Sequence, residues 1–428
     1  MATLESIVFK AHRAKILATG SVEWLPHKNR EVISQLPQIM WNDASPWREA
    51  NLWAMSIATS HRTSIKSVWS QMKHVYAYAN WLEDNHMTWW NFPDRESDRC
   101  LVQYRGALIR ARDAGNLAPT TTQQRMYAVI KFYRWLIKNK LLSDKLSLWN
   151  DNQIGIVVKN AFGYTRTIIK NSSDLAIPCN NAICDRLEDG LTPVTRDDVK
   201  IIMNFAEQHA SVELYLMLRL GFNTGMRFGS ISSLRISSIH NAVRMSTLSG
   251  YGRINLGPGA RPAVQTKYGV NGEAFISHDD LALIEDYCFS SRRLRRAAKA
   301  AQASRDLIFL TRFGKAYGSE GSDFSQAINV ELSRLRKRAA QNGLECFQNF
   351  HFHQTRCTFA TELARVALPH GLDFAIQIVK EALLHRNEST TLRYIKFVEK
   401  DAIMKKAADT FYLTMLYGEQ GNESNRGS

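Results

Sequence analysis

The stretch FHFHQTRCTFATELA (350–364), with ALLHRNESTTLRYIKF (382–397) after it, decides how the rest of the chain is interpreted. His353 and Arg356 stand three residues apart, so on a helix their side chains share one face. His385 precedes Tyr394 by nine residues. Arginine can grip two phosphate oxygens at once, histidine can move a proton, and a phenol beside them is a candidate nucleophile. A solvated helix face or a structural hydrogen bond would give the same local pattern, so the other parts of a phosphodiester site must come from elsewhere in the chain.

The charge balance favours a polyanionic partner. The chain has 55 Lys+Arg against 40 Asp+Glu, a formal net charge of +15. Release of condensed counterions then favours nucleic acid, ahead of an anionic membrane, although some basic proteins are merely soluble. At 428 residues, 45% hydrophobic and 22% charged, the chain is typical of a globular protein with two or three domains.

Targeting and redox signals indicate a cytoplasmic protein. No apolar run has the length of a membrane span, and the N-terminus lacks the apolar core of a secretory signal. The six cysteines are scattered and form no CxxC pair, which indicates a reduced protein without a disulfide framework or a zinc site.

The first half of the chain is predicted to contain a helical domain over residues 61–165. Apolar residues at steps of three and four predict helices over 63–84, 97–115 and 118–142. The polar face of the third helix carries cations that could reach DNA phosphates, although a solvated face is the alternative: Arg125, Lys131, Arg134 and Lys138. Residues 1–60 are expected to form a small helical cap packed by tryptophans, with a DNA-reading arm as the alternative.

A linker is expected over residues 166–192, because Asn, Ser, Pro and Gly are frequent there. A second domain then begins with a capped helix after Thr195. Its next helix is apolar on nearly all sides and stops at Gly225, which places Arg227 at a helix start, where backbone amides favour a phosphate. Residues 251–277 are punctuated by Gly, Pro and Asn and predict a hairpin sheet with strands at GRINL, PAVQT and EAFIS. Lys267 lies in one of its turns.

The segment SSRRLRRAAKAA (290–301) predicts a basic helix. We expect its arginines either to contact DNA phosphates or to form a solvated face: Arg292, Arg293, Arg295 and Arg296.

Taken in order, TGMR, TKYG, HQTRCTFAT, ALLH and STTLRYIK resemble the motifs of the tyrosine recombinase (phage integrase) family. Each fragment is weak, but five in the right order are specific. The resemblance covers about 190–410 and extends to the helical first domain. It implies a mainly α fold with a small sheet, in which a core-binding domain and a catalytic domain over 193–410 form a C-shaped clamp around DNA.

The resemblance also implies the reaction and its residues: a site-specific recombinase, here the integrase of a mobile element in a bacterial cell, associated with the nucleoid. Tyr394 would be the nucleophile that forms a 3′-phosphotyrosine, and Lys267 the acid that protonates the leaving 5′ oxygen. The remaining catalytic residues would be Arg227, His353, Arg356 and His385. No metal or other cofactor is implied. The partner is double-stranded DNA, bound by a homotetramer on two sites.

The C-terminal end is predicted to assist assembly. Residues 400–418 have amphipathic spacing suited to docking on a neighbouring protomer or on their own domain, with Ile403, Ala407, Phe411, Leu413 and Leu416 as expected anchors. We assign 411–428 to this docking segment and a disordered tail, because GEQGNESNRGS is polar.

Two departures from the family pattern bear on function. The acidic residue expected three positions after Arg227 is Ser230, and the glycine expected before His385 is Leu384. The first leaves open what orients Arg227. The same residues would suit a resolvase or a nicking–closing enzyme of the topoisomerase IB type, and a non-cutting DNA-binding protein is a further alternative.

Overall fold

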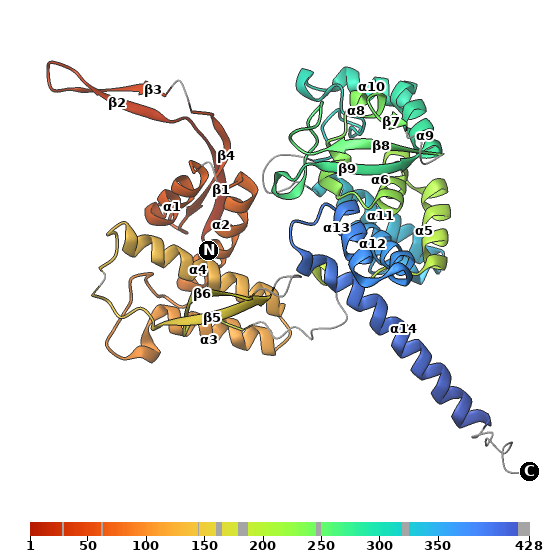
Figure 1. The fold of residues 1–428 in the computed structure, drawn as a ribbon. Helices are drawn as coiled ribbons and strands as arrows, with labels where there is room; N and C mark the ends of the chain where they lie inside the picture. Colours follow the sequence, from red (N-terminus) through yellow and green to blue (C-terminus); the bar gives the residue numbers. More distant parts are fainter. Residues whose placement is uncertain are drawn as a thin grey trace, which may run out of the picture. The chain divides into compact units, whose positions relative to one another are not determined.

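The structure, a computed structural model, describes residues 1–27, 30–60, 63–143, 145–159, 165–178, 187–244, 250–318 and 325–417. The chain divides into two compact units after residue 181, and each has its own core (Figure 1). Helices predominate in both units and the sheets are small, so the predicted fold class is confirmed. Among the described residues, no helix is both long and apolar enough to span a membrane.

Strands occupy much of residues 3–40 in the first unit, so the expected helical cap over residues 1–60 is wrong for that part. Strand β1 (Thr3–Phe9) pairs antiparallel with β4 (Ile33–Met40), and β2 (His12–Ile16) pairs with β3 (Val22–Pro26). In β4, Leu36, Pro37 and Ile39 are buried, and the strand contacts the two helices that follow it in the chain, but its buried positions do not alternate and so gave no period-two signal. Among the residues of this segment that the structure describes, the helix is α1 (Arg48–Ala58).

The three predicted helices of the first unit are present as α2 (Ile65–Asp84), α3 (Cys100–Asp113) and α4 (Pro119–Lys138). Ser64 caps α2 by accepting a hydrogen bond from the amide of Ser67, and Pro119 occupies the first turn of α4, where its missing N–H costs nothing. Their apolar faces enclose Trp47 and Trp53, which are fully buried.

Strands β5 (Asp151–Lys159) and β6 (Thr165–Ser173) pair antiparallel in a nine-residue register. The prediction of a linker starting at residue 166 is therefore wrong for 166–173. The sequence TRTII, rich in β-branched residues, favours a strand, and linker-like composition begins only after it.

The second unit contains the remaining helices, which are α5 (Arg196–His209), α6 (Val212–Thr224), α7 (Phe228–Ser232), α8 (Ile236–His240), α9 (His278–Phe289), α10 (Ser291–Lys299), α11 (Gln326–Gln341), α12 (His353–Ala367), α13 (Leu372–Ala382) and α14 (Glu388–Tyr417). Thr195 and Ser211 cap α5 and α6 by accepting from the amides of Asp198 and Leu214. Helix α6 is buried on most sides, as its sequence predicted, and α12 packs against it. These two helices carry the ends from which the site is built.

A three-stranded sheet lies beside these helices in the order β7 (Val243–Arg244), β8 (Tyr251–Leu256) and β9 (Gly272–Ser277). Strands at GRINL and EAFIS were predicted, but PAVQT forms only an isolated bridge between Gly257 and Val264. The connection from β8 to β9 is thus a long loop. Short 3-10 helices complete the fold: η1 (Glu96–Asp98), η2 (Glu188–Gly190), η3 (Lys267–Gly269), η4 (Gln302–Ser304), η5 (Glu345–Phe347) and η6 (Leu368–His370).

Candidate active site

Arg227 is placed by the sharp end of α6. Gly225 adopts φ +65°, and a Cβ there would lie 2.3 Å from Cδ1 of Phe359, so both conformation and space require glycine. The chain turns at this glycine and brings Arg227 to the start of α7, as the sequence predicted. Its guanidinium reaches Oε1 of Glu188 at 3.3 Å.

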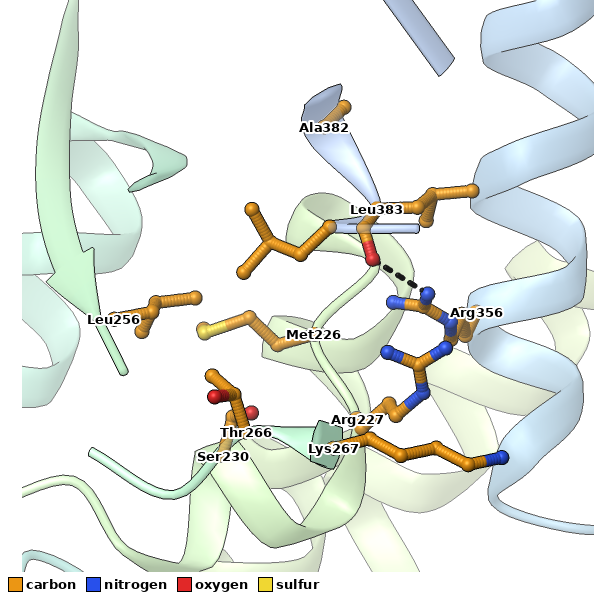
Figure 2. Close-up of a pocket in the computed structure, with 10 residues that line it drawn as sticks. Met226, Arg227, Ser230, Leu256, Thr266, Lys267, Arg356, Ala382 and Leu383 are labelled. Atoms are coloured by element: carbon orange, nitrogen blue, oxygen red, sulfur yellow. Dashed lines mark hydrogen bonds between the residues drawn. The ribbon is translucent and has the colours of Figure 1, made fainter. Parts of the chain in front are cut away.

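Arg356 is held by backbone carbonyls from two other segments. It lies on α12 with only 3% of its surface exposed. Nη1 donates to the carbonyl of Gly225 and Nη2 to the carbonyl of Leu383, both at 2.7 Å, and Figure 2 shows its guanidinium beside that of Arg227. Nε remains directed at Glu188, 3.6 Å from Oε2. Arg356 therefore ties the end of α6 and the end of α13 to α12.

His385 follows a strained turn after α13. Leu384 has φ +52°, a conformation that a glycine would adopt without cost. The leucine fits because β9 has a glycine opposite: a Cβ on Gly272 would lie 2.1 Å from Cδ2 of Leu384. The imidazole of His385 is buried, with Nδ1 at 2.9 Å from the hydroxyl of Thr391 and Nε2 at 3.0 Å from Oε1 of Glu188.

Glu188 stands at the centre of this group, and the sequence analysis missed it. Its carboxylate lies within 3.6 Å of both arginines and both histidines, including Nε2 of His353 at 3.1 Å. Glu188 falls in the sequence LEDG, inside the expected linker. The composition of this segment does not indicate that it contacts the arginine and histidine motifs later in the chain. The available signal was a short acidic pair between two leucines in a strongly basic chain. Glu188 is therefore an acidic residue that contacts Arg227, although Ser230 replaces the acid expected three positions after that arginine.

The electrostatics of the cluster keep Glu188 ionised. Burial alone would raise the pKa of this carboxyl, but hydrogen bonds from His353 and His385 and the charges of Arg356 and Arg227 outweigh burial and hold it well below its usual range. Burial, followed by the charge of Arg227, lowers the pKa of Arg356 to about 10, which leaves it protonated at neutral pH. Burial lowers the pKa of His385 as well, against the opposing effect of Glu188.

Tyr394 lies next to the cluster but is not exposed to solvent. Its side chain is 0% exposed in a small core with Cys357 and Leu187, and its ring stacks on His385 with centroids 5.9 Å apart. The hydroxyl is 3.9 Å from Sγ of Cys357. Burial, with Cys357 and Glu188 nearby, raises the pKa of the phenol well above its ordinary value. A reaction at Tyr394 therefore requires the side chain to leave this core.

Lys267 lies on η3 in the β8–β9 loop and lines the same small pocket as Arg227 and Arg356 (Figure 2). Its ammonium is exposed and lies 5.5 Å from the ring centroid of Tyr268. Ser230 also lines the pocket, and its hydroxyl donates to the carbonyl of Gln265 at 2.7 Å. The serine that replaces the expected acid thus anchors the loop that carries Lys267.

The predicted DNA-contacting residues of α4 differ in their surroundings. Lys131 and Lys138 are exposed, and Arg125 is half-buried. Arg134 pairs with Asp151 at 2.7 Å and lies over the ring of Trp149, so its charge is engaged within the unit.

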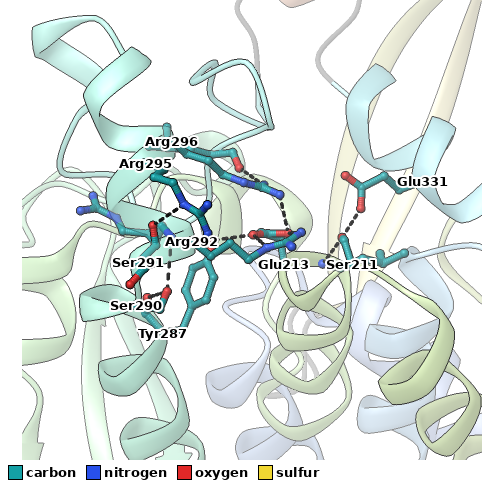
Figure 3. A network of polar contacts seen from close by, with 12 residues as sticks. Ser211, Glu213, Tyr287, Ser290, Ser291, Arg292, Arg295, Arg296 and Glu331 are labelled. Carbon is teal, nitrogen blue, oxygen red and sulfur yellow. Dashed lines mark hydrogen bonds and ion pairs between the residues drawn. The ribbon is translucent and has the colours of Figure 1, made fainter.

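Arg293 and Arg296 of α10 are largely buried, which contradicts their assignment to DNA contact, whereas DNA contact by Arg292, with 44% of its side chain exposed, stays a prediction. Arg292 and Arg296 pair with Glu213, which is fully buried on α6, at 2.8 and 3.0 Å (Figure 3). Arg293 is 3% exposed and donates to the carbonyls of Arg305 and Leu307. A buried carboxylate needs such partners, and a basic helix sequence does not reveal them. Arg295 remains on the surface, with a hydrogen bond to the carbonyl of Ser291.

Residues 193–400 match the profile of the phage integrase family. This stretch of the chain contains every proposed catalytic residue and all of helices α5–α13. The second unit of this chain belongs to the phage integrase family. It is therefore a tyrosine recombinase, an enzyme that breaks and rejoins DNA strands, and the predicted family is confirmed. No match was found among curated proteins.

Solved integrase structures are similar at low identity. One is the Tn1549 transposon integrase in complex with a circular intermediate DNA, at 13% identity, covering 84% of this chain and 99% of that chain, with a TM-score of 0.49. Another is a lambda integrase dimer bound to a COC′ core site, at 13% identity, covering 82% and 95%, with a TM-score of 0.44. At these values the family assignment rests on the profile match to 193–400.

Proposed function

We propose that this tyrosine recombinase is a site-specific recombinase, the integrase of a mobile genetic element, that cuts and rejoins double-stranded DNA through a 3′-phosphotyrosine at Tyr394. One observation carries the proposal: Arg227, Arg356, His353 and His385 converge on a single carboxylate. A phosphodiester is an anion with the same charge, and groups that surround one such anion can surround the other.

The cluster would act on the charge that develops during substitution. As the phenol oxygen attacks phosphorus, negative charge grows on the non-bridging oxygens. Arg227 and Arg356 would hold these oxygens, and a loss of either donor set would cost about 3–4 kcal/mol of transition-state stabilisation. Arg356 is already oriented by the carbonyls of Gly225 and Leu383, so little reorganisation is needed.

Protons move at both ends of the reacting bond. The phenol proton would pass to His353 as the bond from the Tyr394 oxygen to phosphorus forms, and the bond from phosphorus to the 5′ oxygen breaks. Lys267 would give its proton to that 5′ oxygen. The product is a 3′-phosphotyrosine and a free 5′-hydroxyl, and attack by another 5′-hydroxyl reverses the step.

A suicide substrate tests this proposal. The full-length protein is incubated with nicked DNA carrying a candidate site, and covalent adducts are read on denaturing gels. We expect Tyr394→Phe to abolish the adduct while DNA binding survives, and Tyr412→Phe, an exposed tyrosine of α14, to leave it unchanged. An adduct that persists in Tyr394→Phe would refute the assignment of the nucleophile.

DNA binding by the first unit would involve α4. Lys131 and Lys138 are the exposed cations there, and we assign residues 61–165 to a core-binding role on this basis. Each lysine that contacts a phosphate contributes about 0.9 to the slope of log K against log salt. The double variant Lys131→Ala/Lys138→Ala should therefore bind all sequences more weakly with a shallower salt slope. An unchanged slope would remove α4 from the interface.

Assembly into a tetramer on two DNA sites would use α14. The helix continues without a break to Tyr417 and leaves large apolar side chains on its surface, including Ile403, Phe411 and Met415, at 66%, 66% and 70% exposed. The side chains of Leu413 and Leu416 and the tail over 418–428 lie outside the described residues. Phe411→Asp should leave the unfolding of the monomer unchanged but prevent assembly on DNA in sedimentation analysis. Intact assembly would exclude this face.

A further inference from the structure

The carboxylate of Glu188 contacts the two arginines and two histidines that the proposed reaction needs to bind its phosphate. Oε1 lies 3.0 Å from His385 and 3.3 Å from Arg227, whereas Oε2 lies 3.1 Å from His353 and 3.6 Å from Arg356. A carboxylate resembles the two non-bridging oxygens of a phosphodiester in charge and in having two adjacent acceptors. A phosphate cannot engage these donors while the carboxylate keeps them.

The segment that carries Glu188 is closed by a hydrogen bond of its own and is attached to α12 on its C-terminal side. We call residues 187–191 the strap. Within it, the amide of Leu187 donates to the carbonyl of Leu191 at 3.0 Å, and Gly190 closes the turn with φ +75°. After the strap, the carbonyl of Thr192 accepts from Gln354 on α12 at 3.0 Å. The strap is thus a defined turn whose conformation directs Glu188 into the cluster.

The strap also contacts the buried nucleophile. Leu187 is 3% exposed and belongs to the same small core as Tyr394, Cys357 and Val398. Withdrawal of Leu187 would open one side of that core, so removal of the carboxylate and release of the phenol are linked through two neighbouring residues. The boundary between the two units, after residue 181, lies just before the strap in the chain.

We propose that Glu188 occupies the position of the scissile phosphate in the DNA-free protein, and that the strap withdraws when DNA enters, which frees the cationic cluster and Tyr394 together. This inference rests on the proposed function for the identity of the phosphate. Glu188 is then an internal competitor of the substrate. The opposite role, a permanent support that must keep Arg227 and Arg356 in place during catalysis, predicts the reverse effect of the same substitution.

Glu188→Gln separates the two roles, with Glu345→Gln as a control that removes an equal charge from an exposed site on the same unit. Without DNA, Glu188→Gln should unfold at a lower temperature, because two arginines are left without their anion. With the nicked suicide substrate, it should form the covalent adduct at least tenfold faster than wild type. An adduct rate equal to or below that of wild type would overturn the proposal.

A second variant and a second measurement guard against misfolding. Leu187→Ala loosens the strap without removing the carboxylate, and it should also speed adduct formation, by a smaller factor. In wild-type protein, amide hydrogens of residues 187–191 should exchange faster when cognate DNA is bound. Slower exchange on DNA would mean that the strap stays in place, and would refute its withdrawal.

Failure of the proposed function remains distinguishable. If no form of the protein makes an adduct, the recombinase reaction is refuted, but anion binding still reports on Glu188. Inorganic phosphate, compared with chloride at equal ionic strength, should raise the unfolding temperature of Glu188→Gln by more than that of wild type. Equal shifts in both proteins would show that the carboxylate does not compete for the site.

Discussion

Replacement of Arg356 by lysine should destabilise the second unit although it retains the charge. The guanidinium donates to two buried backbone carbonyls, of Gly225 and Leu383, and still faces Glu188. A lysine ammonium is a point charge that cannot span all three. Loss of one charged hydrogen bond with a buried acceptor left unpaired costs about 2–4 kcal/mol. At about 2–4 °C per kcal/mol for a unit of this size, the melting temperature should fall by roughly 5–15 °C.

The distribution of tryptophan gives this experiment an internal control. All 10 tryptophans precede residue 150, so tryptophan fluorescence reports on the first unit alone. Far-ultraviolet circular dichroism reports on the helices of both units. Arg356→Lys should shift the circular dichroism transition and leave the fluorescence transition unchanged, whereas Arg295→Lys, on the surface of α10, should shift neither. If Arg356→Lys lowers the free energy of unfolding by less than about 0.5 kcal/mol, the size expected of a surface substitution, the structural role of the guanidinium is refuted.

Three further predictions concern the same unit. Lys267→Ala should slow strand cleavage about 10²- to 10⁴-fold. The cleavage rate should recover on a substrate whose 5′ oxygen is replaced by sulfur, because sulfur is a better leaving group. A rate that does not recover would show that Lys267 is not the general acid. Gly272→Ala should destabilise the unit by about 1–3 kcal/mol in urea unfolding, because its Cβ would overlap Leu384, and a neutral result would contradict that packing. The pKa of Glu188 is depressed on folding, so its contribution to stability is complete above about pH 5 and is lost as pH falls below the unfolded value of about 4.3. The stability difference between wild type and Glu188→Gln should therefore narrow between pH 5 and 3, and a constant difference would speak against the ion pairs.

The helices of both units were predictable because their signals are local. Apolar spacing predicted α2, α3 and α4 to within a few residues, and the cap at Thr195 predicted the start of α5. Ordered motifs indicated the family, and the profile match confirmed it. Strands β1–β3 were missed because their side chains are mostly exposed and leave little alternation to detect, and β4 was missed because its buried residues do not alternate.

Long-range pairing was not predictable from local patterns. In sequence, Arg292 and Arg296 are indistinguishable from cations on a DNA-contacting helix face. In the structure, both form ion pairs with the buried Glu213, about 80 residues earlier in the chain. Glu188 lies 165 residues before His353, and only the fold shows that they meet. Charge on a helix face indicates that a partner exists, but it does not identify the partner.

The fit between Gly272 and Leu384 has a consequence for chimeras of this protein with its relatives. The turn before His385 and strand β9 are complementary in volume, because the leucine fills the space that the missing side chain leaves. A hairpin grafted from a relative with a larger residue at this position would push the turn, and with it the histidine, away from the cluster. Leu384→Gly introduced at the same time should accommodate such a graft. The hairpin and the histidine turn are therefore best exchanged as one unit in domain engineering.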